Sequence, residues 1–367
     1  MGTAANGALS RPARAWRSPL PPAVTVALAC LATELIAYVL IIHERGLGGD
    51  APYYARIANH PAGPHNFPYA FRIGVPYLVH VLPFSHAFSW EALALIAAAV
   101  AGGAMYALLR EFEIAPWLAA WLTVGFSVSP PLLVVFLRNG VEVDAEAIMV
   151  ITLGCLFVVR RQRLAFALTL LVGTTVHESC LFLIPLAYAV WAKRLLDPDA
   201  LRDLALTAGL PIVAYIYLRT NIIAVGKQYQ PGYTGPFFSA RWSVIKQSLR
   251  NGGWHIELRR LALIYGPLWI AAPAALKRLP FSRRGLALIV PCVISMTYAL
   301  DWGRAIFFAA PVFYVAGAYA VRERRRLAVL LVLTLFALDL GYAVYMQVHG
   351  VKHGLDTTGP PARGPVS

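Results

Sequence analysis

The feature that most constrains this chain is a series of long apolar runs separated by short basic clusters. Of its 367 residues, 59% are hydrophobic and only 14% are charged, whereas a soluble domain carries about a quarter charged residues. A run of about 20 apolar residues is long enough to cross a membrane as a helix, and helices satisfy their own backbone hydrogen bonds in lipid. We therefore predict an all-α polytopic membrane protein with a single transmembrane domain.

The apolar runs predict a bundle of about eleven transmembrane helices. They lie at about 22–43, 88–109, 115–137, 145–159, 164–176, 180–192, 203–222, 259–277, 285–300, 305–321 and 327–347. With a cytoplasmic N-terminus, every dense Arg/Lys cluster then falls on the inner side, as the positive-inside rule requires. Residues 164–192 can also be interpreted as one span of about 29 residues, which would invert all later spans. The basic clusters at 277–284 and 322–326 argue against that alternative.

The remaining segments are predicted to flank or connect the bundle. Residues 1–21 read as a disordered basic cytoplasmic tail, 22–348 as the transmembrane domain and 349–367 as a disordered outer tail. Long outer loops are expected at 44–87 and 223–257, with interfacial helices near 52–59, 71–82 and 240–250. Pro130 and Pro131 should kink or end the third span, because proline cannot continue the hydrogen-bond ladder of a helix. We expect the protein in the plasma membrane.

Charge and cysteine usage exclude two other classes of protein. The net charge of +14 is distributed over short clusters between apolar runs, which is typical of cytoplasmic loops and not of a nucleic-acid interface. Cys30, Cys155, Cys180 and Cys292 lie in or beside apolar runs and form no Cys-x-x-Cys pattern. They are predicted to be small buried side chains, and neither a disulfide framework nor a zinc site.

Ionisable residues gather on the predicted outer side, mostly at the ends of spans. The acidic ones are Asp50, Glu142, Asp144, Glu178, Glu257 and Asp301, and the basic ones are Arg56, His60, His65, Arg72, Arg138, His177, Lys227 and Arg304. Ionisable groups near membrane depth are costly and usually mark function. Their gathering at the ends of several spans predicts a cavity that opens outward.

The stretch Gly49-Asp50-Ala51-Pro52-Tyr53-Tyr54 follows the first apolar run and carries the main catalytic candidate. Asp50 is either the N-cap of a short helix with proline in its first turn or a general base, and the two roles are compatible. Tyr53 and Tyr54 are either interfacial aromatics or substrate-binding residues. Arg72 either snorkels to water or binds a phosphate through its fork of donors.

Later outer positions supply weaker candidates. Asp144 is either a helix-start carboxylate or, with Glu142, half of a weak site for a divalent cation. His177-Glu178 is either a polar hairpin or part of the substrate site, and it does not form the HExxH pattern of a zinc protease. Asp301 and Arg304 have the spacing of a helical ion pair, and Arg304 could also bind an anionic lipid.

The order of these elements resembles the GT-C superfamily of membrane glycosyltransferases. An apolar span is followed by Asp50-x-x-Tyr53-Tyr54-x-x-Ile57-Ala58, and then Arg72 opens a proline-containing segment. This order resembles the branch of protein O-mannosyltransferases and lipid A aminoarabinose transferases. The same branch has an Asp at the outer start of a span, a polar break between two short spans, and a basic or aromatic cluster before a proline-containing span. Asp144, His177-Glu178 and the stretch from Arg304 to Pro311 resemble these features.

The resemblance implies an inverting glycosyltransferase with a GT-C-like bundle that works on the outer face. A polyprenyl-phosphate sugar would be the donor, and the acceptor hydroxyl would belong to a glycan, a lipid or a protein. Asp50 would be the general base. Arg72, Arg304 and Lys227 would bind the donor phosphate, and Tyr53, Tyr54, Asp144, His177, Glu178 and Asp301 would bind the substrates. The sequence itself shows no required cofactor, although a divalent cation remains an option at Glu142 and Asp144.

Other functions compete with this one. A transporter or flippase of an anionic lipid-linked sugar would place polar groups near the bilayer midplane and show repeat symmetry, and the sequence has no evident repeat. An outer-face polysaccharide polymerase or ligase would also use Arg and His in outer loops. A structural subunit would not need acids and bases gathered from several spans.

Overall fold

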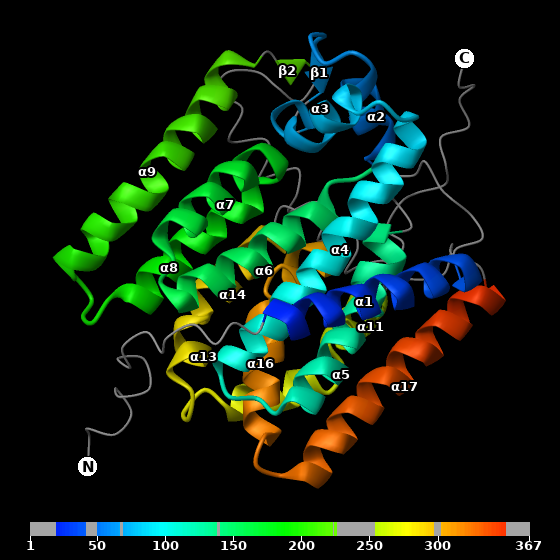
Figure 1. Ribbon diagram of the computed structural model, residues 1–367, viewed down its shortest axis with the longest axis vertical. Helices are drawn as coiled ribbons and strands as arrows, with labels where there is room; N and C mark the ends of the chain where they lie inside the picture. Colours follow the sequence, from blue (N-terminus) through cyan, green and yellow to red (C-terminus); the bar gives the residue numbers. More distant parts are fainter. Residues whose placement is uncertain are drawn as a thin grey trace.

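A computed structural model describes residues 20–41, 50–66, 69–137, 140–222, 224–225, 254–296 and 302–349. Its described part is all-α apart from two short strands, β1 (His65–Asn66) and β2 (Ala224–Val225), which pair in parallel. The helices are α1 (Leu20–Ile41), α2 (Ala51–Asn59), α3 (Gly74–Val81), α4 (His86–Glu111), α5 (Pro116–Ser127), α6 (Asp144–Arg160), α7 (Arg163–Val176), α8 (Leu183–Trp191), α9 (Pro198–Asn221), α11 (Trp254–Tyr265), α12 (Leu268–Ala274), α13 (Pro280–Arg284), α14 (Leu286–Met296), α15 (Trp302–Phe307), α16 (Ala310–Val321) and α17 (Arg325–His349). Short 3-10 turns cover Tyr69–Phe71 and Glu178–Phe182, and a π-helical turn covers Pro131–Leu137. Figure 1 shows these helices packed into one bundle.

Three of the described helices are long and apolar enough to cross a membrane. They are α1 over Pro22–Leu40, α4 over its full length, and α9. The helix α7, the segment Glu178–Trp191 and α16 are apolar but shorter. The composition of these helices agrees with a membrane protein, and their outer faces expose large apolar side chains such as Val39 and Leu206.

Three of the expected spans are each two helical segments and not one continuous helix. The span expected at 115–137 ends as α5 at Ser127 and resumes as the π-helical turn, because Pro130 and Pro131 interrupt the backbone ladder. The span at 259–277 divides at Gly266, whose φ of +46° lies in the left-handed region, into α11 and α12. The span at 305–321 divides into α15 and α16.

The break expected inside 164–192 is present. His177 has an extended backbone (φ −157°, ψ 136°), which ends α7 at Val176 and starts a new turn at Glu178. The interfacial helix expected near 52–59 corresponds to α2, and the one near 71–82 corresponds to the shorter α3. The helix expected at 240–250 and most of both predicted tails lie outside the described residues.

The core of the bundle forms around α4, which packs mainly on α1 and α6. Its buried face is rich in alanine and glycine, which let helix backbones approach closely. A Cβ atom added at Gly102 would lie 2.9 Å from the Sγ atom of Cys30 on α1. All four cysteines of the chain are buried and unbridged, as the sequence predicts.

A second close approach fixes the end of the bundle that carries α2 and α3 (Figure 1). A Cβ atom at Gly74, the first residue of α3, would lie 2.3 Å from the Oγ1 atom of Thr175 near the end of α7. Only glycine leaves room for this contact. Because Arg72 precedes α3 and Glu178 follows α7, the contact brings these two residues to the same place.

Candidate active site

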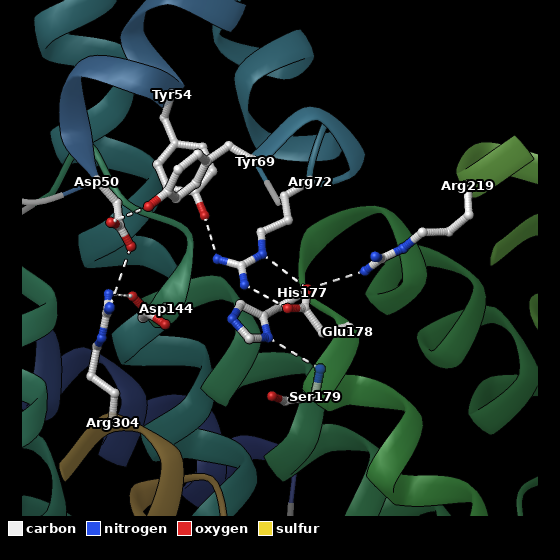
Figure 2. Close-up of polar contacts among 10 residues, drawn as sticks. All are labelled: Asp50, Tyr54, Tyr69, Arg72, Asp144, His177, Glu178, Ser179, Arg219 and Arg304. Carbon is white, nitrogen blue, oxygen red and sulfur yellow. Dashed lines mark hydrogen bonds and ion pairs between the residues drawn. The ribbon is translucent and has the colours of Figure 1, made fainter. Parts of the chain in front are cut away.

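The site is built on Asp50, which occupies the N-cap position of α2. Its backbone carbonyl accepts a hydrogen bond from the Tyr53 amide at 3.0 Å, but its carboxylate makes no capping bond. Instead, Oδ1 accepts a 2.6 Å hydrogen bond from the Tyr69 hydroxyl, and Oδ2 lies 3.3 Å from Nη2 of Arg304. The carboxylate is therefore directed away from its own helix and toward Tyr69 and Arg304 (Figure 2).

Arg304, from α15, gathers three carboxyl groups around one guanidinium. Besides Asp50, its Nη1 atom lies 3.0 Å from Oε2 of Glu142 and 3.0 Å from Oδ2 of Asp144. Phe307, one turn further along α15, packs in a buried aromatic group with its ring 5.6 Å from that of Phe126. We call Asp50, Glu142, Asp144 and Arg304 the acidic cluster.

The two buried carboxyls of the acidic cluster differ in protonation. Burial is the main cause that raises the pKa of Glu142 well above its usual value, and the nearby Asp144 and Asp50 charges add to it. Burial also disfavours the charged form of Asp144, but Arg304, His177 and Arg72 together hold its pKa below its usual value. Glu142 therefore keeps a proton under conditions in which Asp144 is ionised.

Glu142 and Asp144, the candidates for a divalent cation, share the Arg304 guanidinium as a partner. The Nη1 atom of Arg304 lies 3.0 Å from a carboxyl oxygen of each. Within the described residues, no group of three or more His, Cys, Asp or Glu side chains is arranged to hold a metal ion.

A second cluster lies beside the first and is centred on Arg72. Its Nε and Nη2 atoms donate to Oε2 and Oε1 of Glu178 at 2.9 and 2.6 Å, which is the bidentate geometry of a strong charge-assisted pair. Nη1 donates to the Tyr54 hydroxyl at 2.7 Å. Arg219, from the end of α9, is 3.9 Å from Oε2 of Glu178. We call Arg72, Arg219, Glu178 and Tyr54 the arginine cluster.

Arg72 and Glu178 of the arginine cluster stay charged in spite of burial. Desolvation disfavours an ionised Glu178, but Arg72 and further neighbours, including Arg219, hold its pKa far below its usual value. The pKa of Arg72 is raised in turn, because Glu178 and Tyr54 outweigh the cost of burying its charge. Glu178 is therefore an anion throughout the physiological range.

His177 lies between the two clusters and is neutral. Burial, assisted by Arg72, lowers its pKa to about 4. Its Nδ1 atom accepts a hydrogen bond from the Ser179 backbone amide at 3.1 Å, so the neutral ring carries its proton on Nε2. The ring packs 5.3 Å from that of Phe308. His177 can therefore donate a hydrogen bond without adding charge.

Tyr69 joins the two clusters. Its hydroxyl binds Asp50, its ring stacks on Tyr53 at 4.5 Å, and it meets the Tyr54 ring edge-on at 5.3 Å. The Arg72 guanidinium lies 5.9 Å from the Tyr69 ring centre. Tyr54 is buried, whereas Tyr53 is exposed at the rim.

Comparison with known proteins gives no relative on which to base a function. No model of a known protein family matches the chain, and no curated protein is significantly similar to it. An assignment of function to this chain therefore depends on the geometry of the two clusters.

Most of the residues singled out from the sequence meet here. The structure brings together Asp50, Tyr54, Arg72, Asp144, His177, Glu178 and Arg304 (Figure 2). Glu142, which Figure 2 does not draw, joins them through its contact with Arg304. Lys227 and Asp301 lie outside the described residues, so their proposed roles stay predictions.

Sequence reasoning did not single out Tyr69 and Arg219. Tyr69 had no distinguishing signal among the many aromatic residues of the chain. Arg219 had one, because it is a basic residue at the predicted outer end of an apolar run. The positive-inside rule makes that position unusual.

Proposed function

We propose that the protein is a membrane glycosyltransferase that moves a sugar from a polyprenyl-phosphate donor to an acceptor hydroxyl. One observation carries the proposal. The Asp50 carboxylate, which does not cap its own helix, lies beside the arginine cluster at one end of a helical bundle. Transfer from a lipid phosphate needs both parts: a base for the incoming hydroxyl and cations for the departing phosphate. The proposed site faces outward from the plasma membrane.

In this proposal Asp50 is the general base. Tyr69 and Arg304 hold its two oxygens, and a fixed carboxylate can take the proton of a hydroxyl placed against it. General bases contribute about 10²- to 10⁴-fold to rate. The geometry favours a positioning role for Arg304, since its guanidinium already faces three carboxyl groups. The proposed base activates the hydroxyl for direct attack on the anomeric carbon, with inversion.

The donor phosphate is assigned to Arg72, with Lys227 as a further candidate. As the sugar–phosphate bond breaks, the leaving oxygen gains negative charge, and a buried guanidinium stabilises that charge. The Nε2 proton of His177 can donate to the phosphate or to a sugar hydroxyl. Tyr53, at the rim, offers its ring to a sugar or an acceptor. Asp144 and Asp301 are proposed to position substrates.

The test uses purified protein in nanodiscs with a panel of polyprenyl-phosphate sugars and candidate glycan, lipid and peptide acceptors. Released polyprenyl phosphate and glycosylated acceptor are measured for the wild type, for Asp50→Asn and for Asp199→Asn, which changes a carboxylate at the start of α9. The proposal expects the wild type to release polyprenyl phosphate and glycosylated acceptor in equal amounts, and Asp199→Asn to do the same. Asp50→Asn should lower the rate of transfer by at least about 10². A wild type that moves an intact lipid-linked sugar across a vesicle membrane, without releasing phosphate, would instead identify a transporter.

A further inference from the structure

We propose that Arg219 is a second phosphate-binding residue, which with Arg72 holds the single negative charge of a lipid-linked phosphodiester. The inference rests on the proposed function and names a residue of the donor site that was not singled out from the sequence. Its ligand chemistry is a phosphate on a lipid. The donor is the source that the geometry favours, because the site also contains Asp50.

Arg219 reaches the site from the end of α9, whereas Arg72 lies in the short segment before α3. Its guanidinium lies 4.3 Å from the ring centre of Phe71 and 5.0 Å from that of Tyr215, so two aromatic rings hold its plane in place. One of its nitrogens is 3.9 Å from Oε2 of Glu178, beyond the range of a hydrogen bond. Its buried Nε atom has no hydrogen-bond partner within the described residues. The Arg219 guanidinium thus lies beside the site, and its Nε–H donor has no partner among the described residues.

The charges of the arginine cluster do not cancel. Arg72 and Arg219 are cations, Glu178 is one anion, and His177, which lies beside the cluster, is neutral. Both arginines meet the same oxygen of Glu178, so the carboxylate holds two positive groups close together. One positive charge is left over, which equals the charge of one phosphodiester. The acidic cluster, in contrast, surrounds a single arginine with three carboxyl groups and would repel a phosphate.

The position of Arg219 also fits a ligand that arrives from lipid. The helix α9 lies at the edge of the bundle (Figure 1), and Leu206, Leu210, Val213 and Tyr217 follow one face of it with exposed side chains. Arg219 lies two residues beyond Tyr217, on the side of α9 opposite to this apolar face, and Figure 2 shows its side chain turned inward to Glu178. The chain of a polyprenyl phosphate can lie against the apolar outer face, and its phosphate then reaches the arginine by passing around the end of the helix.

The experiment measures binding, so it does not depend on turnover. Wild type, Arg219→Gln, Arg219→Lys and Arg202→Gln are reconstituted in neutral nanodiscs and titrated with a fluorescent polyprenyl-phosphate hexose. Phosphatidylglycerol serves as competitor. Arg202 is the matched control, because it is an exposed arginine near the other end of α9. Thermal unfolding of each variant reports whether it is folded.

The inference expects Arg219→Gln to weaken donor binding by about ten- to a hundredfold, the range of a lost charge-assisted hydrogen bond. Arg219→Lys should recover part of this loss, and Arg202→Gln should bind like the wild type. Equal binding by a folded Arg219→Gln variant would overturn the inference, while Asp50-dependent transfer in the same preparation would leave the proposed function standing. Competition by phosphatidylglycerol as strong as that of unlabelled donor would overturn the donor assignment in favour of a bound membrane lipid. A wild type that binds no polyprenyl phosphate would overturn both proposals.

Discussion

Replacing Arg304 with methionine tests whether the acidic cluster depends on one guanidinium. The substitution leaves Glu142 and Asp144, which are 3% and 6% exposed, without their cation, and it also removes a contact of Asp50. Breaking a buried ion pair by removing one partner costs about 3–5 kcal/mol. Because the Arg304 side chain is 26% exposed and Glu142 holds a proton, we expect the lower end, about 3 kcal/mol.

The assay is thermal unfolding in detergent, followed by intrinsic fluorescence. At about 2 °C per kcal/mol, the expected loss lowers the Tm by about 6 °C at pH 7. The matched control is Arg163→Met, which removes a 2.5 Å ion pair with Asp203. Since the Arg163 side chain is 56% exposed, that pair is worth at most about 1 kcal/mol, and its loss should shift the Tm by less than about 2 °C.

The Tm difference between the wild type and Arg304→Met should also depend on pH, in a direction set by the pKa of Asp144. In the wild type, Arg304 helps to lower the pKa of Asp144, so this stabilisation is present above the ordinary Asp pKa and is lost as the pH falls through the lowered value. Without Arg304, burial should raise the pKa of Asp144, and the variant should lose stability as the pH rises. The difference in Tm should therefore narrow from pH 7 to pH 5, and Asp144→Asn added to Arg304→Met should restore part of the loss. An Arg304→Met variant with a Tm as high as that of Arg163→Met would refute the reasoning. So would a Tm difference between the wild type and Arg304→Met that grows as the pH falls.

Three further predictions concern single residues around the site. Tyr69→Phe removes the 2.6 Å hydrogen bond to Asp50 and should slow transfer about tenfold, measured by initial rates, while lowering the Tm by about 3 °C; an unchanged rate would count against this positioning role. Gly74→Ala places a Cβ atom 2.3 Å from Oγ1 of Thr175 and should cost about 1–3 kcal/mol in thermal unfolding, with part recovered by Thr175→Ala. Burial lowers the pKa of His177 to about 4, so the wild type should lose stability as the pH falls from about 6.5 toward 4. His177→Gln should flatten that slope, and an equally steep slope in the variant would assign it to another group.

The sequence predicts the helices better than it predicts their continuity. Hydropathy locates the apolar segments, because a helix needs apolar side chains whether it is buried in lipid or in the protein core. It does not resolve the breaks at Gly266 and between α15 and α16, since a short interruption inside an apolar run hardly changes its composition. The break at Pro130 and Pro131 was predictable, because proline lacks the amide that a helix needs.

The polar residues of the site were predictable individually, and their pairing was not. Asp50, Arg72 and Glu178 stand out because charged groups are rare in this chain. Arg72 and Glu178 are 106 positions apart, and their pairing depends on the close contact of Gly74 with α7. Arg304 is also separated from its partners by at least 160 positions. The pairing of residues so far apart in the sequence is set by tertiary packing, which the periodicity of the sequence does not reveal.

Donor binding and sugar transfer, measured on the same preparations of wild type, Asp50→Asn and Arg72→Gln, test whether the site has a base half and a phosphate half. We expect Asp50→Asn to bind the polyprenyl-phosphate sugar as tightly as the wild type and to lose transfer by at least about 10². We expect Arg72→Gln to lose binding at least about tenfold. Transfer by Asp50→Asn at the wild-type rate, or a loss of donor binding in Asp50→Asn but not in Arg72→Gln, would contradict this division of the site.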